Sequence, residues 1–240
     1  MPGLGTIVNV AAIVIGGLIG LLFGSFMTDK FQNSVVTACG VSTLFIGISG
    51  AMAKALVITP DGIDTTGTMM MIISLVIGTV IGELLHIEDG LEHFGEWLKE
   101  KTGNSKDNSF VNAFVTASLT VCIGAMAVVG SIQDGIYGDH STLFAKAVLD
   151  LIIIIIMTAS LGKGAIFSAV SVGIFQGVMT AVSGFIEPFL NTASLNNLSY
   201  VGSVMIFCVG INLVWGKKVR VASMLPGLIA AVICAYLPWF

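Results

Sequence analysis

Charged residues are scarce in this chain. Only 10% of its 240 residues are charged, whereas 55% are hydrophobic, and the mean hydropathy is +0.99. An ordinary soluble domain has about 25% charged residues. So few charges cannot cover a water-facing surface, so lipid must surround most of the protein. The net charge of -4 is not gathered into a tail, and the absence of a basic face excludes nucleic acid as a partner.

The sequence also lacks the motifs of common catalytic and metal sites. It contains no Ser-His-Asp set, HExxH motif or phosphate-cradling glycine loop. Its four cysteines lie in apolar runs without a CxxC pair, which is typical of buried structural cysteine. We therefore expect no catalytic residues, metal or cofactor, and no enzyme activity. An intramembrane enzyme would lack an evident nucleophile and base.

Long apolar runs predict an all-α protein with about eight transmembrane spans. A span needs roughly 20 apolar residues, and several runs are shorter, which indicates tilting, thinning or helices broken by glycine. We expect one membrane domain over residues 1–240, with seven spans as the alternative. The runs are Leu4–Gly24, Val35–Ala53, Met69–Leu85, Val111–Gly130, Leu143–Ser160, Ala165–Gly184, Tyr200–Trp215 and Val221–Trp239.

The basic residues favour this count. With eight spans, eight of the ten Lys and Arg residues fall on one side, and only Lys54 and Lys146 do not. Loops rich in Lys and Arg lie in the cytoplasm. We therefore expect both termini outside and the basic loops inside. A wrong number of spans would have scrambled the bias.

Residues 87–103 predict an amphipathic helix between the spans of residues 4–85 and those of residues 111–239. Acidic residues such as Glu88 fill one face. The other face has an apolar stripe at helical spacing, which consists of Ile87, Leu91, Phe94 and Leu98. Such a helix lies on the membrane surface or against the bundle. His86 and His93 belong to this polar region, where a solvated face is the ordinary interpretation.

Similar glycine patterns indicate an internal repeat. The first run resembles the sixth, the second resembles the seventh, and the third resembles the eighth. Equivalent spans are five apart, so the two copies would lie in opposite orientations, as in inverted-repeat transporters. Gly16, Gly20 and Gly24 also form GxxxGxxxG, which suits close packing within the protein or at a dimer face.

Asp150 is the most informative residue because it lies near the centre of the fifth span. Lys146 precedes it by one helical turn on the same face. Charges within spans are costly, so the pair should face the bundle interior or a wet cavity. It is either a structural link between helices or a site for a substrate, ion or proton.

Further polar residues lie near this pair or within other spans. The segment Gly130–Gly135 contains Ser131, Gln133 and Asp134, and its flanking glycines can bend the chain and expose carbonyls. An ordinary polar hairpin is the alternative. Asn9, Gln176 and Asn212 each need a partner, and they either link helices or line a pathway.

Three segments resemble a known bacterial family. They are GTIVNVAAIVIGGLIGLLFG, GAMAVVGSIQDGIYGD and FAKAVLDL. The chain is similar over nearly its whole length to the inner-membrane family called domain of unknown function 554, the YqgA-like proteins. The resemblance implies a multi-pass protein of the bacterial plasma membrane. It directs attention to Gln133, Asp134, Lys146 and Asp150.

A transporter for a small solute or ion is the first functional hypothesis, with a homodimer as its possible assembly. Asp150 would bind a cation or proton, Lys146 would be its counter-charge, and Gln133 with Asp134 would form the outer mouth. The alternatives are a passive channel and a membrane scaffold that binds partners through residues 87–103.

Overall fold

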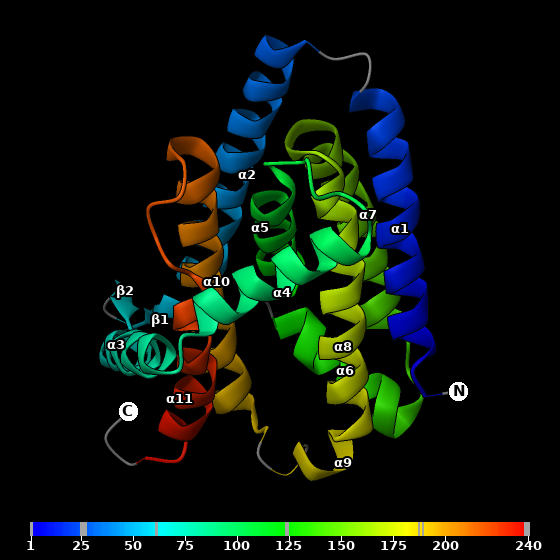
Figure 1. The fold of residues 1–240 in the computed structure, drawn as a ribbon. Coiled ribbons are helices and arrows are strands. Elements are labelled where there is room, and N and C mark those ends of the chain that lie inside the picture. The colour runs from blue at the N-terminus through cyan, green and yellow to red at the C-terminus, as the bar shows by residue number, and fades with distance from the viewer. Residues whose placement is uncertain are drawn as a thin grey trace. The chain divides into compact units, whose positions relative to one another are not determined.

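Helices account for nearly all the regular structure in the computed structural model (Figure 1). It describes residues 2–24, 28–60, 62–122, 125–186, 188 and 190–237. The elements are α1 (Leu4–Gly24), α2 (Asp29–Ala55), β1 (Leu56–Thr59), β2 (Gly62–Thr65), α3 (Thr68–Leu84), α4 (Ile87–Lys101), α5 (Phe110–Cys122), α6 (Ala125–Tyr137), α7 (Ser141–Leu161), η1 (Lys163–Phe167), α8 (Ser168–Ala181), α9 (Ser183–Ile186), α10 (Thr192–Trp215), η3 (Ala222–Met224) and α11 (Pro226–Cys234).

Two compact units make up the chain, and each combines distant parts of the sequence. The first contains Met1–Cys39 with Asp89–Glu187, and the second contains Gly40–Glu88 with Pro188–Phe240. The first unit therefore holds α1, α5, α6, α7 and α8. The second holds most of α2, together with α3, α10 and α11.

Close helix packing in the first unit depends on the predicted glycine stripe. In α1, a Cβ at Gly16 would lie 2.7 Å from the Leu151 carbonyl oxygen of α7. At Gly24 it would lie 3.0 Å from the carbonyl oxygen of Ala159. Both residue numbers rise together, so α1 and α7 run parallel and in backbone contact. Small residues permit this close approach. The resulting van der Waals packing holds the helices together in a membrane, where no hydrophobic driving force acts between them.

The expected fourth span is broken. Sequence analysis predicts one helix over Val111–Gly130, but α5 and α6 meet at a bend of 62°. Gly124 lies outside the described residues. The second helix continues to Tyr137, so Gln133 and Asp134 are helical residues and do not belong to a hairpin loop.

The amphipathic helix packs against α5. The ring centroids of Phe94 in α4 and Phe114 in α5 are 5.8 Å apart in an edge-on arrangement. Leu98, on the same predicted stripe, is buried. The amphipathic helix was expected on the membrane surface or against the bundle, and its apolar stripe lies against the bundle.

Antiparallel helix pairs form the second unit. Gly47 of α2 meets Phe207 of α10, and Gly50 meets Ser203. In the other pair, a Cβ at Gly227 of α11 would lie 2.8 Å from the Ser74 carbonyl oxygen of α3. The unit also contains an unpredicted feature, because β1 and β2 form an antiparallel hairpin between α2 and α3.

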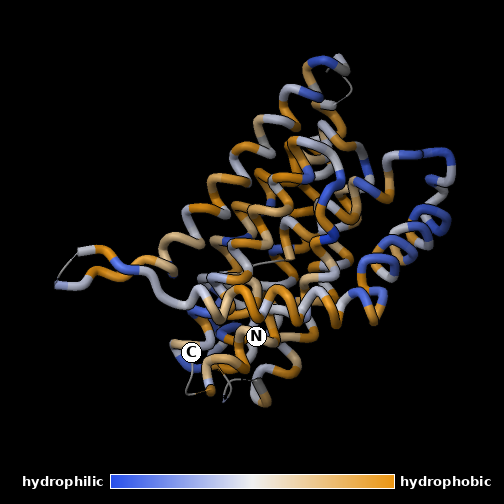
Figure 2. Tube along the Cα trace, turned by 90° about the vertical axis from the view of Figure 1, so that its left-hand side faces the viewer, coloured by the Kyte–Doolittle hydropathy of each residue, from blue (hydrophilic) through white to orange (hydrophobic). Residues whose placement is uncertain are grey.

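The helices are apolar over most of their length, and hydrophilic residues gather on α4 and near helix ends (Figure 2). Among the described residues, five helices are long and apolar enough to cross a membrane, or seven if each of two bent pairs forms one span. The protein is a polytopic transmembrane helix bundle. Eight spans would also require the shorter apolar helix at Ala222–Cys234 to cross, and this number stays a prediction. Trp239, the expected end of the last span, lies outside the described residues.

Glycine packing generates the first test. Gly16→Ala should lower the midpoint of thermal unfolding in detergent, since the added methyl group must push α1 away from the α7 backbone. Overpacking of this kind costs about 1–3 kcal/mol. Gly177→Ala in α8 is the matched control, because nothing lies within 4 Å of a Cβ there. Equal melting of the two variants would contradict the observed contact.

Candidate functional site

The charged pair in α7 is buried within the first unit. Asp150 is 3% exposed and Lys146 is 6% exposed. The Lys146 ammonium donates to Asp150 Oδ2 from one turn earlier in the same helix. Asn9 Nδ2 of α1 donates to the same oxygen at 3.0 Å. The site therefore joins three residues that sequence analysis selected from two distant spans.

A backbone carbonyl completes the surroundings of the ammonium. Lys146 Nζ donates to the Val121 oxygen at 2.7 Å. Val121 lies in the last turn of α5, where carbonyls have no partner within the helix and carry the negative end of the helix dipole. The ammonium is thus held between a carboxylate and the C-terminal end of a short helix, next to the bend between α5 and α6.

Several buried polar atoms of the first unit have no hydrogen-bond partner. Among the described residues, six buried side-chain N or O atoms are unpartnered, and four of them belong to Thr6, Asn9 and Gln176. Both amide atoms of Gln176 are in this group, although the residue is only 1% exposed. An unpartnered buried polar group costs about 1–3 kcal/mol. These three residues therefore keep free hydrogen-bonding capacity within the first unit.

The register of α1 against α8 places Gln176 at the level of this cluster. Gly17 meets Ile166, and a Cβ at Gly173 would lie 3.4 Å from Val10, so the two helices run antiparallel. Gln176 comes three positions after Gly173 and is therefore level with Ile7, which lies between Thr6 and Asn9.

The register of α8 against α5 also gives the level of Gln176. Gly164 meets Phe110, and Ser118 Oγ donates to Ser171 Oγ at 3.0 Å. The helices α5 and α8 therefore run parallel, and Gln176 lies just beyond the level of Cys122, where α5 ends. Asn9, Lys146 and Asp150, which hydrogen bonds join, are called the α7 site below, together with Thr6 and Gln176 at the same level of α1 and α8.

Two of the other predicted site residues have their hydrogen bonds satisfied elsewhere in the first unit. Ser131 donates its hydroxyl to the Ala127 carbonyl of its own helix at 2.6 Å, and its carbonyl accepts from Thr180 of α8 at 3.2 Å. Gln133 Oε1 accepts from Thr142 Oγ1 of α7 at 2.7 Å. These contacts hold α6 against its neighbours.

Asp134 organises the start of α1. Its carboxylate accepts the backbone N–H groups of Gly3 and Gly5 at 3.1 and 3.0 Å, and it pairs with His140 Nδ1 at 2.7 Å. A carboxylate at a helix N-terminus satisfies N–H groups that have no partner within the helix and interacts favourably with the dipole. Asp134 is fully buried, so these contacts account for its charge.

Asn212 lies in the second unit, where it fixes the connection between α10 and α11. Its amide Nδ2 donates to the Val219 carbonyl at 2.7 Å, and its Oδ1 accepts from the backbone N–H groups of Lys218 and Val219 at 2.8 and 2.9 Å. Asn212 therefore lies in α10 and its side chain holds the turn that follows this helix, so it does not belong to the α7 site.

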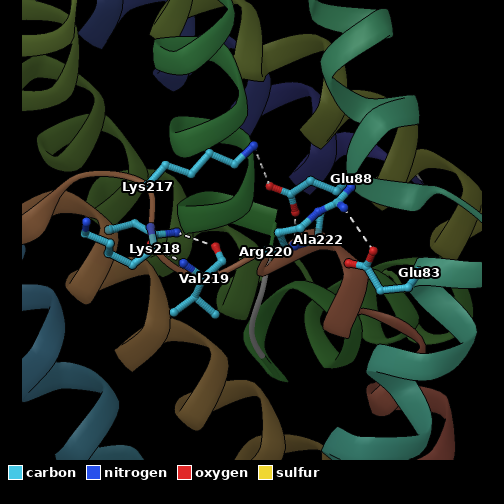
Figure 3. Close-up of polar contacts among 8 residues, drawn as sticks. Glu83, Glu88, Lys217, Lys218, Val219, Arg220 and Ala222 are labelled. Carbon is cyan, nitrogen blue, oxygen red and sulfur yellow. Dashed lines mark hydrogen bonds and ion pairs between the residues drawn. The ribbon is translucent and has the colours of Figure 1, made fainter.

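An acidic corner that sequence analysis missed holds the same connection (Figure 3). Glu88, expected on a solvated helix face, is 2% exposed, accepts the Ala222 N–H at 2.8 Å and pairs with Lys217 at 3.0 Å. Glu83 pairs with Arg220 at 2.9 Å. The positive φ of 52° at His86 marks the tight turn that separates α3 from α4. These contacts join residues far apart in the sequence, so no local sequence pattern predicts them.

The fold and the α7 site define a multi-pass membrane protein with a buried polar site in its first unit. The family model described as "Protein of unknown function (DUF554)" matches residues 4–236, so the chain belongs to this family, as its sequence motifs predicted. It is similar to the uncharacterised membrane protein YdfK of Bacillus subtilis (strain 168), with 27% identity over 94% of this chain and 92% of the relative. It is also similar to the uncharacterised protein YqgA of Escherichia coli (strain K12), with 24% identity over 99% of both chains. No solved structure matches the chain.

The N-terminal contact of Asp134 generates the second test. Asp134→Asn should lower the thermal midpoint, because hydrogen bonds to a buried charge contribute about 1.5–3 kcal/mol each. Asp139→Asn is the control in the neighbouring loop. Asp139 is exposed, and the Ser141 backbone N–H that donates to it at 2.9 Å lowers the pKa of its carboxyl. A larger effect at Asp139 than at Asp134 would contradict this role.

Gln176 generates a third test with an unusual sign. Gln176→Leu removes two unpartnered buried atoms with little change of volume, so the thermal midpoint should rise, in line with a gain of about 1–3 kcal/mol. The same substitution at Gln133 should lower it, because it leaves the Thr142 hydroxyl without its acceptor. A destabilised Gln176→Leu protein would mean that the amide has structural partners.

Proposed function

We propose that this protein is a small-solute or ion transporter of the bacterial plasma membrane, with its substrate bound at the α7 site. The observation that carries the proposal is the concentration of unpartnered buried polar atoms on Thr6, Asn9 and Gln176. In a purely structural cluster we would expect every polar atom to have a hydrogen-bond partner, because an unpartnered polar group is costly in an apolar surrounding. Atoms that stay unmet around a charged pair are better explained by a ligand.

The broken helix supports this function. Transporters commonly bind substrates and ions where a spanning helix is interrupted, because the interruption frees backbone groups near the middle of the membrane. Here the Val121 carbonyl at the end of α5 reaches the α7 site through Lys146. The bend of 62° between α5 and α6 lies directly after it in the sequence.

Helix pairing supports an inverted repeat. The predicted copies are α1 to α3 and α8, α10 and α11, so the equivalent pairs are α1 with α8, α2 with α10, and α3 with α11. Each of these pairs is in contact and antiparallel. A two-fold axis in the membrane plane produces such pairs when it passes between equivalent helices. Inverted repeats support transport because they let a transporter open its substrate site to either side of the membrane in turn.

Orientation follows from charge. We place both termini outside, because the loops that contain Lys30, Lys99, Lys163 and Lys217 would then face the cytoplasm. The corner formed by Glu83 and Glu88 would lie on that side. A homodimer remains a prediction.

Binding and flux test the function together. A panel of inorganic ions, amino acids, polyamines and small organic acids would be screened for a concentration-dependent rise in the thermal midpoint, since a ligand that binds only the folded protein stabilises it. Positive compounds would then be measured as labelled uptake into proteoliposomes. We expect saturable uptake that Asp150→Asn lowers about tenfold or more, because a hydrogen bond to a charged group contributes about 1.5–3 kcal/mol.

Asp64→Asn is the matched control, since this carboxylate is exposed in β2. It should leave uptake unchanged. Uptake that rises without saturation would favour a channel. Absence of both binding and uptake with a folded parent protein would favour a scaffold that uses α4.

A further inference from the structure

The Lys146 ammonium has the surroundings of a bound metal cation. It donates hydrogen bonds to the Asp150 carboxylate and to the Val121 carbonyl oxygen at the C-terminal end of α5. Carboxylate and carbonyl oxygens are the ligands that hard cations prefer. Transporters coordinate Na⁺ with free backbone carbonyls and the C-terminal ends of half-helices, and the Val121 carbonyl at the end of α5 is such a group.

We propose that Lys146 is a built-in cation, whose ammonium fills a monovalent-cation site formed by Asp150 and the end of α5. The chain carries this ion covalently, as the last atom of a side chain from α7. A site for Na⁺ or K⁺ in the same place is therefore already occupied in the parent protein.

Charge balance gives the proposal a consequence for the substrate. Lys146 and Asp150 neutralise each other, and both are buried. An added ion at the α7 site would leave one uncompensated charge, which is strongly unfavourable in a low dielectric. The free atoms of Gln176 include both a donor and an acceptor. This inference rests on the proposed transport function. The site should bind a solute that has no net charge and carries both a hydrogen-bond donor and an acceptor, such as an amide or an amino-acid zwitterion.

Removal of the built-in ion should create a site for a free one. Lys146→Ala deletes the ammonium and its stem, and leaves Asp150 facing the Val121 carbonyl across an open space. The thermal midpoint would be measured in detergent at constant ionic strength, with choline chloride replaced stepwise by chlorides of sodium, potassium, ammonium or methylammonium. We expect the variant to melt several degrees below the parent in choline and to recover in a saturating manner with at least one small cation.

Three proteins serve as controls. The parent should melt at the same temperature in every cation. Lys146→Met should not respond, because its unbranched side chain fills the space without a charge. The double variant Lys146→Ala/Asp150→Asn should not respond, because the carboxylate that attracts the cation is gone.

The proposal is overturned if folded Lys146→Ala melts identically in all cations, or if the parent responds as strongly as the variant. Lys146→Ser is run in parallel, because its hydroxyl can bond to its own helix. Failure of both variants to assemble in every cation would also count against the proposal, since a bound ammonium ion should replace the missing charge. The experiment reads stability and not flux, so a protein without transport activity would still show the response if the cation site exists.

Discussion

A charge in an apolar surrounding must find its counter-charge within hydrogen-bond reach, because neither lipid nor packed side chains can solvate it. In the first unit this requirement fixes several elements at once. Lys146 and Asp150 stand one turn apart on α7, Asn9 brings in α1, and the Val121 carbonyl brings in α5. Displacement of any of these three helices would leave a buried donor or acceptor unmet, so the pair sets their relative positions as well as the chemistry of the site.

The same requirement separates the roles of the three carboxylates that are buried in the described part of the chain. Asp134 satisfies N–H groups at the start of α1, and Glu88 satisfies the N–H of Ala222 at the connection before α11. Both carboxylates therefore have a structural role. Asp150 differs, because the residues beside it still have unmet hydrogen-bonding capacity. A buried charge is therefore informative about function when its neighbours remain unsatisfied, and much less so when they are all paired.

The helices and the Lys146–Asp150 pair could be predicted from the sequence because both depend on local patterns. Apolar runs define spans, and the spacing of four between Lys146 and Asp150 puts both on one helix face. The position of the break after Cys122 was not predictable, because glycines occur in most of the apolar runs and do not by themselves mark where a helix is interrupted. The role of Glu88 was missed for a related reason: its place in a polar stripe fits solvent, and only the fold brings Lys217 and Ala222 to it. Thr6 was overlooked because a single threonine in a span normally bonds to its own helix.

Helix pairing also has a consequence for biosynthesis. About 160 residues lie between Gly47 and its contact Phe207, and a ribosome adds that length on the order of ten seconds at ~5–20 residues per second. During this interval α2 lacks the α10 residues that its glycines contact, and α1 likewise lacks α7 until that helix is made. The nascent chain therefore passes through a stage in which its most closely packing surfaces are still empty. Quality-control proteases and insertion chaperones would meet the protein in this state, and a truncated product would never leave it.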